Sequence, residues 1–74
     1  MDKVITAKEI SSKFNLSYQV INRYTNAGLL QVVSKKGNIR MYDRLLTEKR
    51  LKQILELINE GYPFVLIRKK IIGI

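Results

Sequence analysis

Cysteine and histidine, which carry much of the chemistry of enzymes and metal sites, are missing from this sequence of 74 residues. Without cysteine the chain forms neither disulfides nor thiolate metal sites, which fits a reducing cytoplasm. Without histidine, tetrahedral zinc sites are excluded, and no imidazole is available to activate a serine. The chain also lacks a glycine-rich phosphate loop, and its carboxylate pair at helical spacing, Glu56 and Glu60, is expected on an exposed surface. We therefore expect no enzymatic activity, no metal and no cofactor.

Long apolar runs and acidic residues are also scarce. No stretch approaches the roughly 20 apolar residues of a membrane span, and the N-terminus lacks the apolar run of a signal peptide. Six Asp and Glu stand against 14 Lys and Arg, which gives a net charge of +8 and a pI of about 10.1. This excess favours a polyanion such as nucleic acid as the partner. We expect one soluble, cytoplasmic, nucleoid-associated domain over residues 1–74, with no membrane partner.

A capping box near the N-terminus predicts the start of a first helix. Thr6 is followed three residues later by Glu9, so the hydroxyl and the carboxylate can each accept a hydrogen bond from the other residue's backbone amide. Asn15 tolerates the left-handed backbone of a tight turn and is expected to end this helix. Residues 1–5 form a lead-in that either pairs as an edge strand or packs beside the helix. The apolar face of the helix consists of Ala7, Ile10 and Phe14.

A second helix is expected directly after this turn. Ser17 has the short hydroxyl favoured at an N-cap, and Gly28 suits the left-handed residue that follows a helix, so the helix runs from Tyr18 to about Ala27. Two short helices joined in this way are typical of a helix-turn-helix, whose second helix enters the major groove of DNA. The expected core residues are Val20, Ile21, Tyr24, Leu29 and Leu30. The outward residues are Tyr18, Gln19, Asn22 and Arg23.

The next segment changes to the pattern of a β-hairpin. Two β-prone runs, residues 32–33 and 39–42, flank a polar turn that contains Gly37 and Asn38. The pattern puts Arg40 and Tyr42 on one face of the second run and leaves open which face is buried. Lys35 and Lys36, with Arg40 behind them, are either a solvated turn or a cationic wing that lies along the phosphate backbone, and the net charge favours the wing.

Two further helices complete the predicted fold. Residues 43–46 read as a connector, Thr47 as the N-cap of a third helix, and Lys49 and Arg50 then fall in its first turn, where the helix dipole disfavours cations. Gly61 ends that helix, and Pro63 suits the first position of a fourth. The expected apolar stripes are Leu51, Ile54, Leu55 and Ile58 in the third helix, and Phe64, Ile67 and Ile71 in the fourth. Residues 68–70 are expected on its solvated face. The apolar residues Ile71, Ile72 and Ile74 either close the core or form a self-association surface.

The order of these elements and several short motifs resemble the DNA-binding domain of the MerR family of transcription regulators. That family shows Glu-Leu-Ala, Val-Ser, Thr-Ile-Arg-Tyr-Tyr and Gly-Leu-Leu in its helices, Gly-Tyr-Arg-x-Tyr in its wing, and then Glu-Glu-Gly-Tyr. The resemblance implies a winged helix-turn-helix that reads the major groove with its second helix and holds phosphates with its wing. The matching residues here are Glu9 to Ser11, Leu16 and Ser17, Val20 to Tyr24, Gly28 to Leu30, Asn38 to Tyr42, and Glu60 to Tyr62.

The chain departs from the family pattern in three ways. Asn22 stands where the family has the arginine of the recognition helix, and Arg23 takes the place of the first tyrosine. The connector after Tyr42 reads as one residue longer. The long dimerising helix and the effector domain of typical members are missing, which resembles the stand-alone members of the superfamily, namely small developmental regulators that bind DNA in head-to-tail arrays and the excisionases of phages and transposons.

The sequence thus predicts a mainly α fold with a small β-hairpin wing, a winged helix-turn-helix with four helices. The expected function is sequence-specific binding of double-stranded DNA by a transcription regulator without a small-molecule effector domain. The alternatives are an excisionase that bends DNA and a protein-interaction module. The residues expected to read bases are Ser17, Tyr18, Gln19 and Asn22. Those expected to hold the phosphate backbone are Arg23, Lys35, Lys36, Arg40 and Tyr42.

Overall fold

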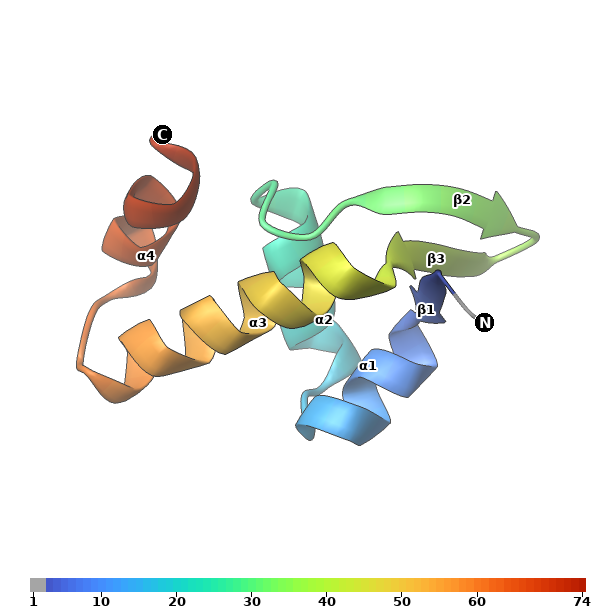
Figure 1. The fold of residues 1–74 in the computed structure, drawn as a ribbon, viewed down its shortest axis with the longest axis horizontal. Coiled ribbons are helices and arrows are strands. Elements are labelled where there is room, and N and C mark those ends of the chain that lie inside the picture. Colours follow the sequence, from blue (N-terminus) through green and yellow to red (C-terminus); the bar gives the residue numbers. More distant parts are fainter. Residues whose placement is uncertain (1–2) are drawn as a thin grey trace.

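A computed structural model describes residues 3–74 and confirms the mainly α class, with four helices and a small sheet. The sheet and its hairpin lie at one end of the molecule, and the fourth helix lies at the other (Figure 1). In chain order the elements are β1 (Val4–Thr6), α1 (Ala7–Phe14), α2 (Tyr18–Asn26), β2 (Val32–Lys36), β3 (Ile39–Asp43), α3 (Arg44–Asn59) and α4 (Phe64–Ile72).

The three strands form an antiparallel sheet in the order β1-β3-β2. Ile5 of β1 pairs with Tyr42 of β3 and is buried, so the lead-in is both an edge strand and a part of the core; its residues 1–2 lie outside the described part of the chain. On β3, Tyr42 is buried whereas Ile39 is 52% exposed, which settles that the Arg40 and Tyr42 face turns toward the helices. The β2–β3 hairpin, residues 32–43, is called the wing below.

The helix-turn-helix has the capping chemistry that the sequence predicts. The Glu9 amide donates to Thr6 Oγ1 at 3.2 Å, and the Thr6 amide donates to the Glu9 carboxylate at 3.0 Å. Asn15 follows α1 with a φ of 55°, and Ser17 Oγ accepts from the Val20 amide at the start of α2. Helix α2 ends at Asn26, close to the predicted Ala27, and Gly28 then has the expected left-handed φ of 85°.

The start of α3 differs from the prediction. Asp43, and not Thr47, is its N-cap, since Asp43 Oδ1 accepts from the Leu46 amide at 2.8 Å. The predicted connector, residues 43–46, therefore does not exist, because Asp43 ends β3 and the helix begins at Arg44. Asp is as good an N-cap as Thr, and it comes first in the chain. Thr47 is instead buried within the helix, and Lys49 and Arg50 lie beyond the first turn, where Arg44 is the cation nearest the N-terminus of the helix.

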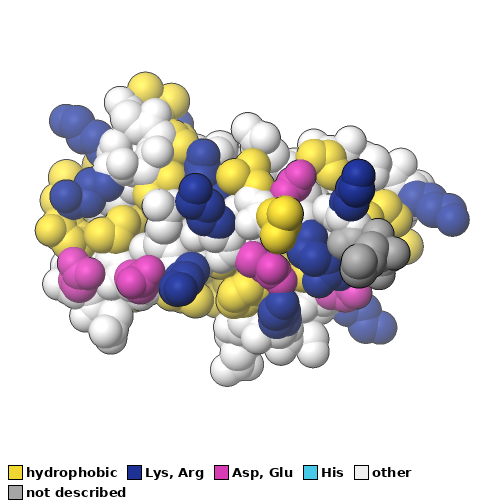
Figure 2. Space-filling view, viewed as in Figure 1, with side chains coloured by type: hydrophobic (Ala, Val, Ile, Leu, Met, Phe, Trp, Pro, Cys, Tyr) yellow, Lys and Arg dark blue, Asp and Glu magenta, His cyan; other side chains and the backbone are white. Residues whose placement is uncertain are grey.

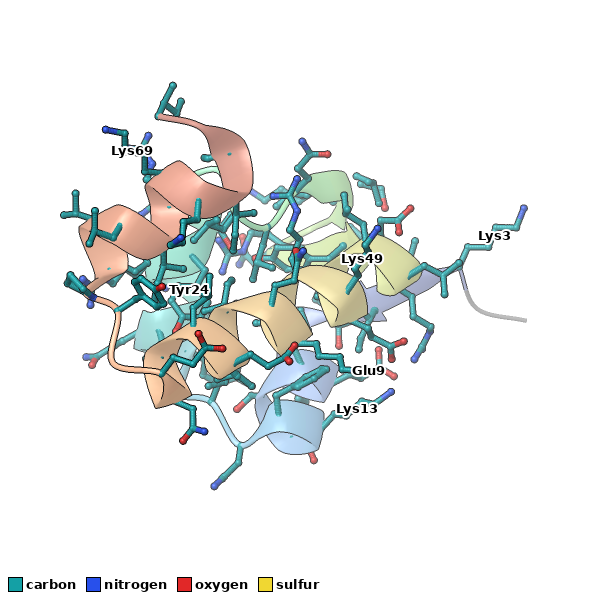
Figure 3. The ribbon with its side chains drawn as sticks, turned by 60° about the vertical axis from the view of Figure 1, so that its left-hand side comes forward. Lys3, Glu9, Lys13, Tyr24, Lys49 and Lys69 are labelled. Carbon is teal, nitrogen blue, oxygen red and sulfur yellow. The ribbon has the colours of Figure 1, made fainter. Side chains whose placement is uncertain are left out.

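Helix α4 packs back against the helix-turn-helix. Pro63 is its N-cap and not its first helical residue, so the helix begins at Phe64, one residue later than predicted. The ring of Phe64 stacks on that of Tyr24, with centroids 5.8 Å apart and planes 8° apart, and Tyr24 lies between α2 and the C-terminal helices (Figure 3). Tyr24 is thus a core residue, as predicted.

One core joins the sheet to all four helices. The predicted stripes are buried at Leu51, Ile54 and Ile67, whereas Ile58 is 46% exposed near the end of α3. Of the C-terminal residues, Ile71 and Ile72 pack against the core and Ile74 is exposed. The buried apolar residues are Ile5, Ile10, Ile21, Tyr24, Leu29, Leu30, Tyr42, Leu51, Ile54 and Ile67.

Candidate nucleic-acid interface

A groove of about 490 Å³ separates the helix-turn-helix from the wing. It brings together Tyr18 and Asn22 of α2 with Arg40 of β3, three residues that the sequence singles out for DNA contact. Lys8 and Asn38 also line it, and sequence reasoning missed them as site residues. The capping box already placed Lys8 at the start of α1, but nothing in the sequence showed how close that helix end lies to the wing. The full lining is Thr6, Ala7, Lys8, Tyr18, Asn22, Asn38, Ile39 and Arg40.

The outward face of α2 is exposed as the helical period predicts. Tyr18 is 52% exposed in the first turn, and Gln19, Asn22 and Arg23 are exposed as well. Ser17 is exposed and uses its hydroxyl oxygen as the N-cap, accepting from the Val20 amide at 3.2 Å. The face therefore offers amides, a phenol and a guanidinium group, which are side chains that hydrogen-bond to base edges and phosphates.

The wing carries Lys35 and Lys36 on an exposed strand. Every residue of β2 is exposed, including Lys35 and Lys36, and Lys35 pairs with Arg40 across the hairpin. Arg40 is half-buried because its guanidinium carbon lies 5.8 Å from the centroid of the Tyr42 ring. Its Nη2 donates a hydrogen bond to Oδ1 of Asn22. The wing is thus joined by a side-chain contact to the helix beside it.

Tyr42 is the one predicted contact residue that the structure removes from the surface. Its side chain is fully buried, and its hydroxyl lies 2.9 Å from Oγ1 of Thr25. A buried phenol cannot reach a phosphate outside the protein, so the prediction that Tyr42 holds the DNA backbone is corrected. The alternation of the strand put Tyr42 on the same face as Arg40, but only the longer arginine side chain extends to the edge of the core.

Arg23 is exposed but is held against α4. Its guanidinium carbon lies 4.1 Å from the centroid of the Phe64 ring, a cation–π contact. Phe64 in turn stacks on Tyr24, and burial raises the pKa of the Tyr24 hydroxyl above its ordinary value of 10.0. The contact with Phe64 thus holds the guanidinium group of Arg23 at the edge of α2, beside α4.

Two arginines from the C-terminal helices bind the backbone at the end of α2. Arg68 Nε donates to the carbonyl of Ala27 at 3.0 Å, and Arg50 Nη1 donates to that of Leu29 at 3.4 Å. The prediction that Arg68 belongs to a merely solvated face is therefore wrong, because the guanidinium reaches back to the helix-turn-helix. The Arg68 contact satisfies the carbonyl of the C-cap residue of α2, which the helix leaves unpaired, and the Arg50 contact holds the segment that follows the helix.

Charge is distributed unevenly along the chain. Residues 10–42, which include α2 and the wing up to Tyr42, contain no Asp or Glu. The carboxylates of α3 lie instead on the face shown in Figure 2, where they are interspersed with basic side chains and where α3 crosses in front of α2. Another hollow, of about 650 Å³ between α1 and α3, is lined by Glu48 and Glu56 as well as by Lys13 and Lys52, so it has no excess of positive charge for a polyanion. Among residues 3–74, no carboxylate lines the groove beside the wing.

A helix-turn-helix flanked by a β-hairpin and closed by two further helices defines a winged helix-turn-helix domain. Residues 5–71 match the sequence model of a family described as MerR HTH family regulatory protein. The match covers nearly the whole chain, so the chain belongs to this family and is a DNA-binding regulator in the general sense of that family. Searches among curated proteins and among solved structures found no significant match. Among residues 3–74, no helix has the length and apolar character needed to cross a membrane.

Proposed function

We propose that the chain binds double-stranded DNA sequence-specifically, with α2 in the major groove and the wing along the phosphate backbone. The groove beside α2 carries this proposal, because polar side chains of the helix and a cationic side chain of the wing meet there, with no carboxylate from the described part of the chain. The width of a major groove admits one α-helix, and a flanking hairpin then reaches the adjacent backbone.

The proposal gives the exposed residues different tasks. Gln19 and Asn22 read base edges, and Tyr18 contributes apolar contact, for example with a thymine methyl group. Ser17 lies at the start of α2, where backbone amides and the helix dipole favour a phosphate. The residues proposed to contact the phosphate backbone are Lys8, Arg23, Lys35, Lys36 and Arg40.

A salt titration tests the proposal directly. If about six phosphates are neutralised, the slope of log K against log [salt] for duplex DNA is expected to be about −5. Fluorescence anisotropy of a labelled duplex measures this slope. A slope near zero would show that the basic surface does not contact phosphates and would overturn the proposal.

A matched pair of double variants locates the contact. Replacing Lys35 and Lys36 by glutamine is expected to make the slope shallower by about 2, since each phosphate contact contributes roughly 0.9. Replacing Lys49 and Lys52 of α3 by glutamine removes the same charge from exposed positions outside the groove. This control is expected to leave the slope nearly unchanged. Equal changes in both variants would indicate binding without a defined face.

A further inference from the structure

The hydrogen bond between Arg40 and Asn22 determines the orientation of the Asn22 side-chain amide as well as the position of the wing. Arg40 Nη2 is the donor and Asn22 Oδ1 is the acceptor. A guanidinium group has N–H donors and no acceptor, so only the oxygen of the Asn22 amide can face it. The amide nitrogen then lies on the other side of the carboxamide, and its free N–H bonds point away from Arg40.

The Arg40 side chain packs on a buried aromatic ring, that of Tyr42. Its guanidinium group lies against the ring of Tyr42, which is fully buried. Thr25 donates its only hydroxyl proton to the Ile21 carbonyl at 2.7 Å, so the 2.9 Å contact between Thr25 and Tyr42 has Tyr42 as its donor. The Tyr42 ring beneath Arg40 is therefore held by a directed hydrogen bond.

The two contacts between wing and helix reinforce one another. Asn22 and Thr25 are three residues apart on α2 and share a face, while Arg40 and Tyr42 are two apart on β3 and share a face. Helix α2 and strand β3 therefore meet at two neighbouring places, Asn22 with Arg40 and Thr25 with Tyr42. Arg40 makes both contacts at once, since its guanidinium group lies over the Tyr42 ring and bonds to Asn22.

We propose that Arg40 is a positioning residue that makes Asn22 a hydrogen-bond donor toward DNA, so that Asn22 selects guanine over adenine. An unrestrained asparagine pairs with adenine, because its oxygen accepts from N6 while its nitrogen donates to N7. Arg40 occupies one of the two lone pairs of this oxygen, and its positive charge disfavours a second donor there, such as adenine N6, so the amide acts through its N–H donors. Guanine offers two acceptors in the major groove, N7 and O6, and matches this pattern. The inference rests on the proposed function, since it assumes that α2 lies in the major groove.

Selection of bound sequences from a random duplex pool tests this inference. The base pair read by Asn22 is the one whose preference disappears in Asn22→Ala. There the wild type is expected to select guanine, and Arg40→Met, which frees the amide oxygen, is expected to lower the ratio of guanine to adenine about tenfold. Asn22→Asp keeps an acceptor for Arg40 but has no N–H donor, so it is expected to lose the guanine preference.

The control is Lys35→Met, which also removes one cation from the wing. It is expected to weaken binding to all sequences and to leave the ratio of guanine to adenine unchanged. Selection of adenine by the wild type, an unchanged ratio in Arg40→Met, the same shift in Lys35→Met, or no altered base pair in Asn22→Ala would each overturn the inference while DNA binding persists. A wild type that enriches no sequence would instead overturn the proposed function, and the inference with it.

Discussion

The hydroxyl oxygen of Tyr42 and Oγ1 of Thr25 lie 2.9 Å apart, so a partly buried hydrogen bond joins the wing to α2. The rest of the wing has little burial of its own, because every residue of β2 is exposed. The orientation of this hairpin beside the helix therefore depends on few contacts, and most of them involve β3.

Tyr42→Phe removes only the hydroxyl of this contact. We expect the free energy of unfolding to fall by about 1 kcal/mol, because one partly buried hydrogen bond is lost and Thr25 loses a donor. In a domain of this size, such a change lowers the melting temperature by roughly 4 to 8 °C. Urea denaturation and thermal melting measure both quantities. Tyr18→Phe is the control, since its hydroxyl belongs to a side chain that is 52% exposed, and equal losses in the two variants would contradict the prediction.

Asp43→Ala is expected to destabilise the protein by about 1 kcal/mol, because the Leu46 amide loses its capping acceptor. Asp43→Asn retains a side-chain oxygen at the same place and is expected to keep most of the stability. Chemical denaturation of the two variants distinguishes them. If Asp43→Ala is as stable as the wild type, the N-cap of α3 has been assigned to the wrong residue.

Arg68→Met keeps the apolar stem of the side chain and removes the donor to the Ala27 carbonyl. We expect a loss of about 1 kcal/mol in the free energy of unfolding, since this hydrogen bond is partly exposed. Lys69→Met removes a charge from the neighbouring exposed position and is expected to change stability by less than about 0.5 kcal/mol. The opposite ranking in equilibrium unfolding would return Arg68 to the solvated role that the sequence suggested.

The capping box predicts a dependence of stability on acid. Hydrogen bonds from the Thr6 backbone and hydroxyl lower the pKa of the Glu9 carboxyl below its ordinary value of 4.5 in the folded chain. Its contribution is therefore present above about pH 4.5 and is lost as the pH falls through the lowered pKa. We expect the melting temperature of the wild type to fall more steeply than that of Glu9→Gln between about pH 5 and pH 3. Parallel curves would contradict the prediction.

The helix-turn-helix could be predicted almost residue by residue, because its signals are local. Thr6 with Glu9, Asn15, Ser17 and Gly28 each act within one turn of backbone, and the structure has all of them in the predicted places. The outward positions of α2 followed from the helical period alone. Local chemistry therefore suffices where a cap and a period agree.

The errors arose where a residue's role depends on a distant segment or on a competing cap. Asp43 and Thr47 are both good N-caps, and only the end of β3 at Asp43 decides between them. Tyr42 was predicted at the DNA surface because sequence alternation gives the face of a strand and not the depth of a side chain. Arg68 contacts a carbonyl 41 residues earlier in the chain, and no local pattern indicates such a contact.

The lack of carboxylates between residues 10 and 42 has a consequence for kinetics. Because α2 and the wing as far as Tyr42 carry basic side chains and no carboxylate, the molecule has an asymmetric electrostatic field, and a polyanion exerts a torque on it during diffusion. That torque turns the surface formed by α2 and the wing toward the polyanion before the two molecules touch. A larger share of collisions then begins in a productive orientation, and raising the ionic strength is expected to reduce the association rate constant more than the dissociation rate constant changes.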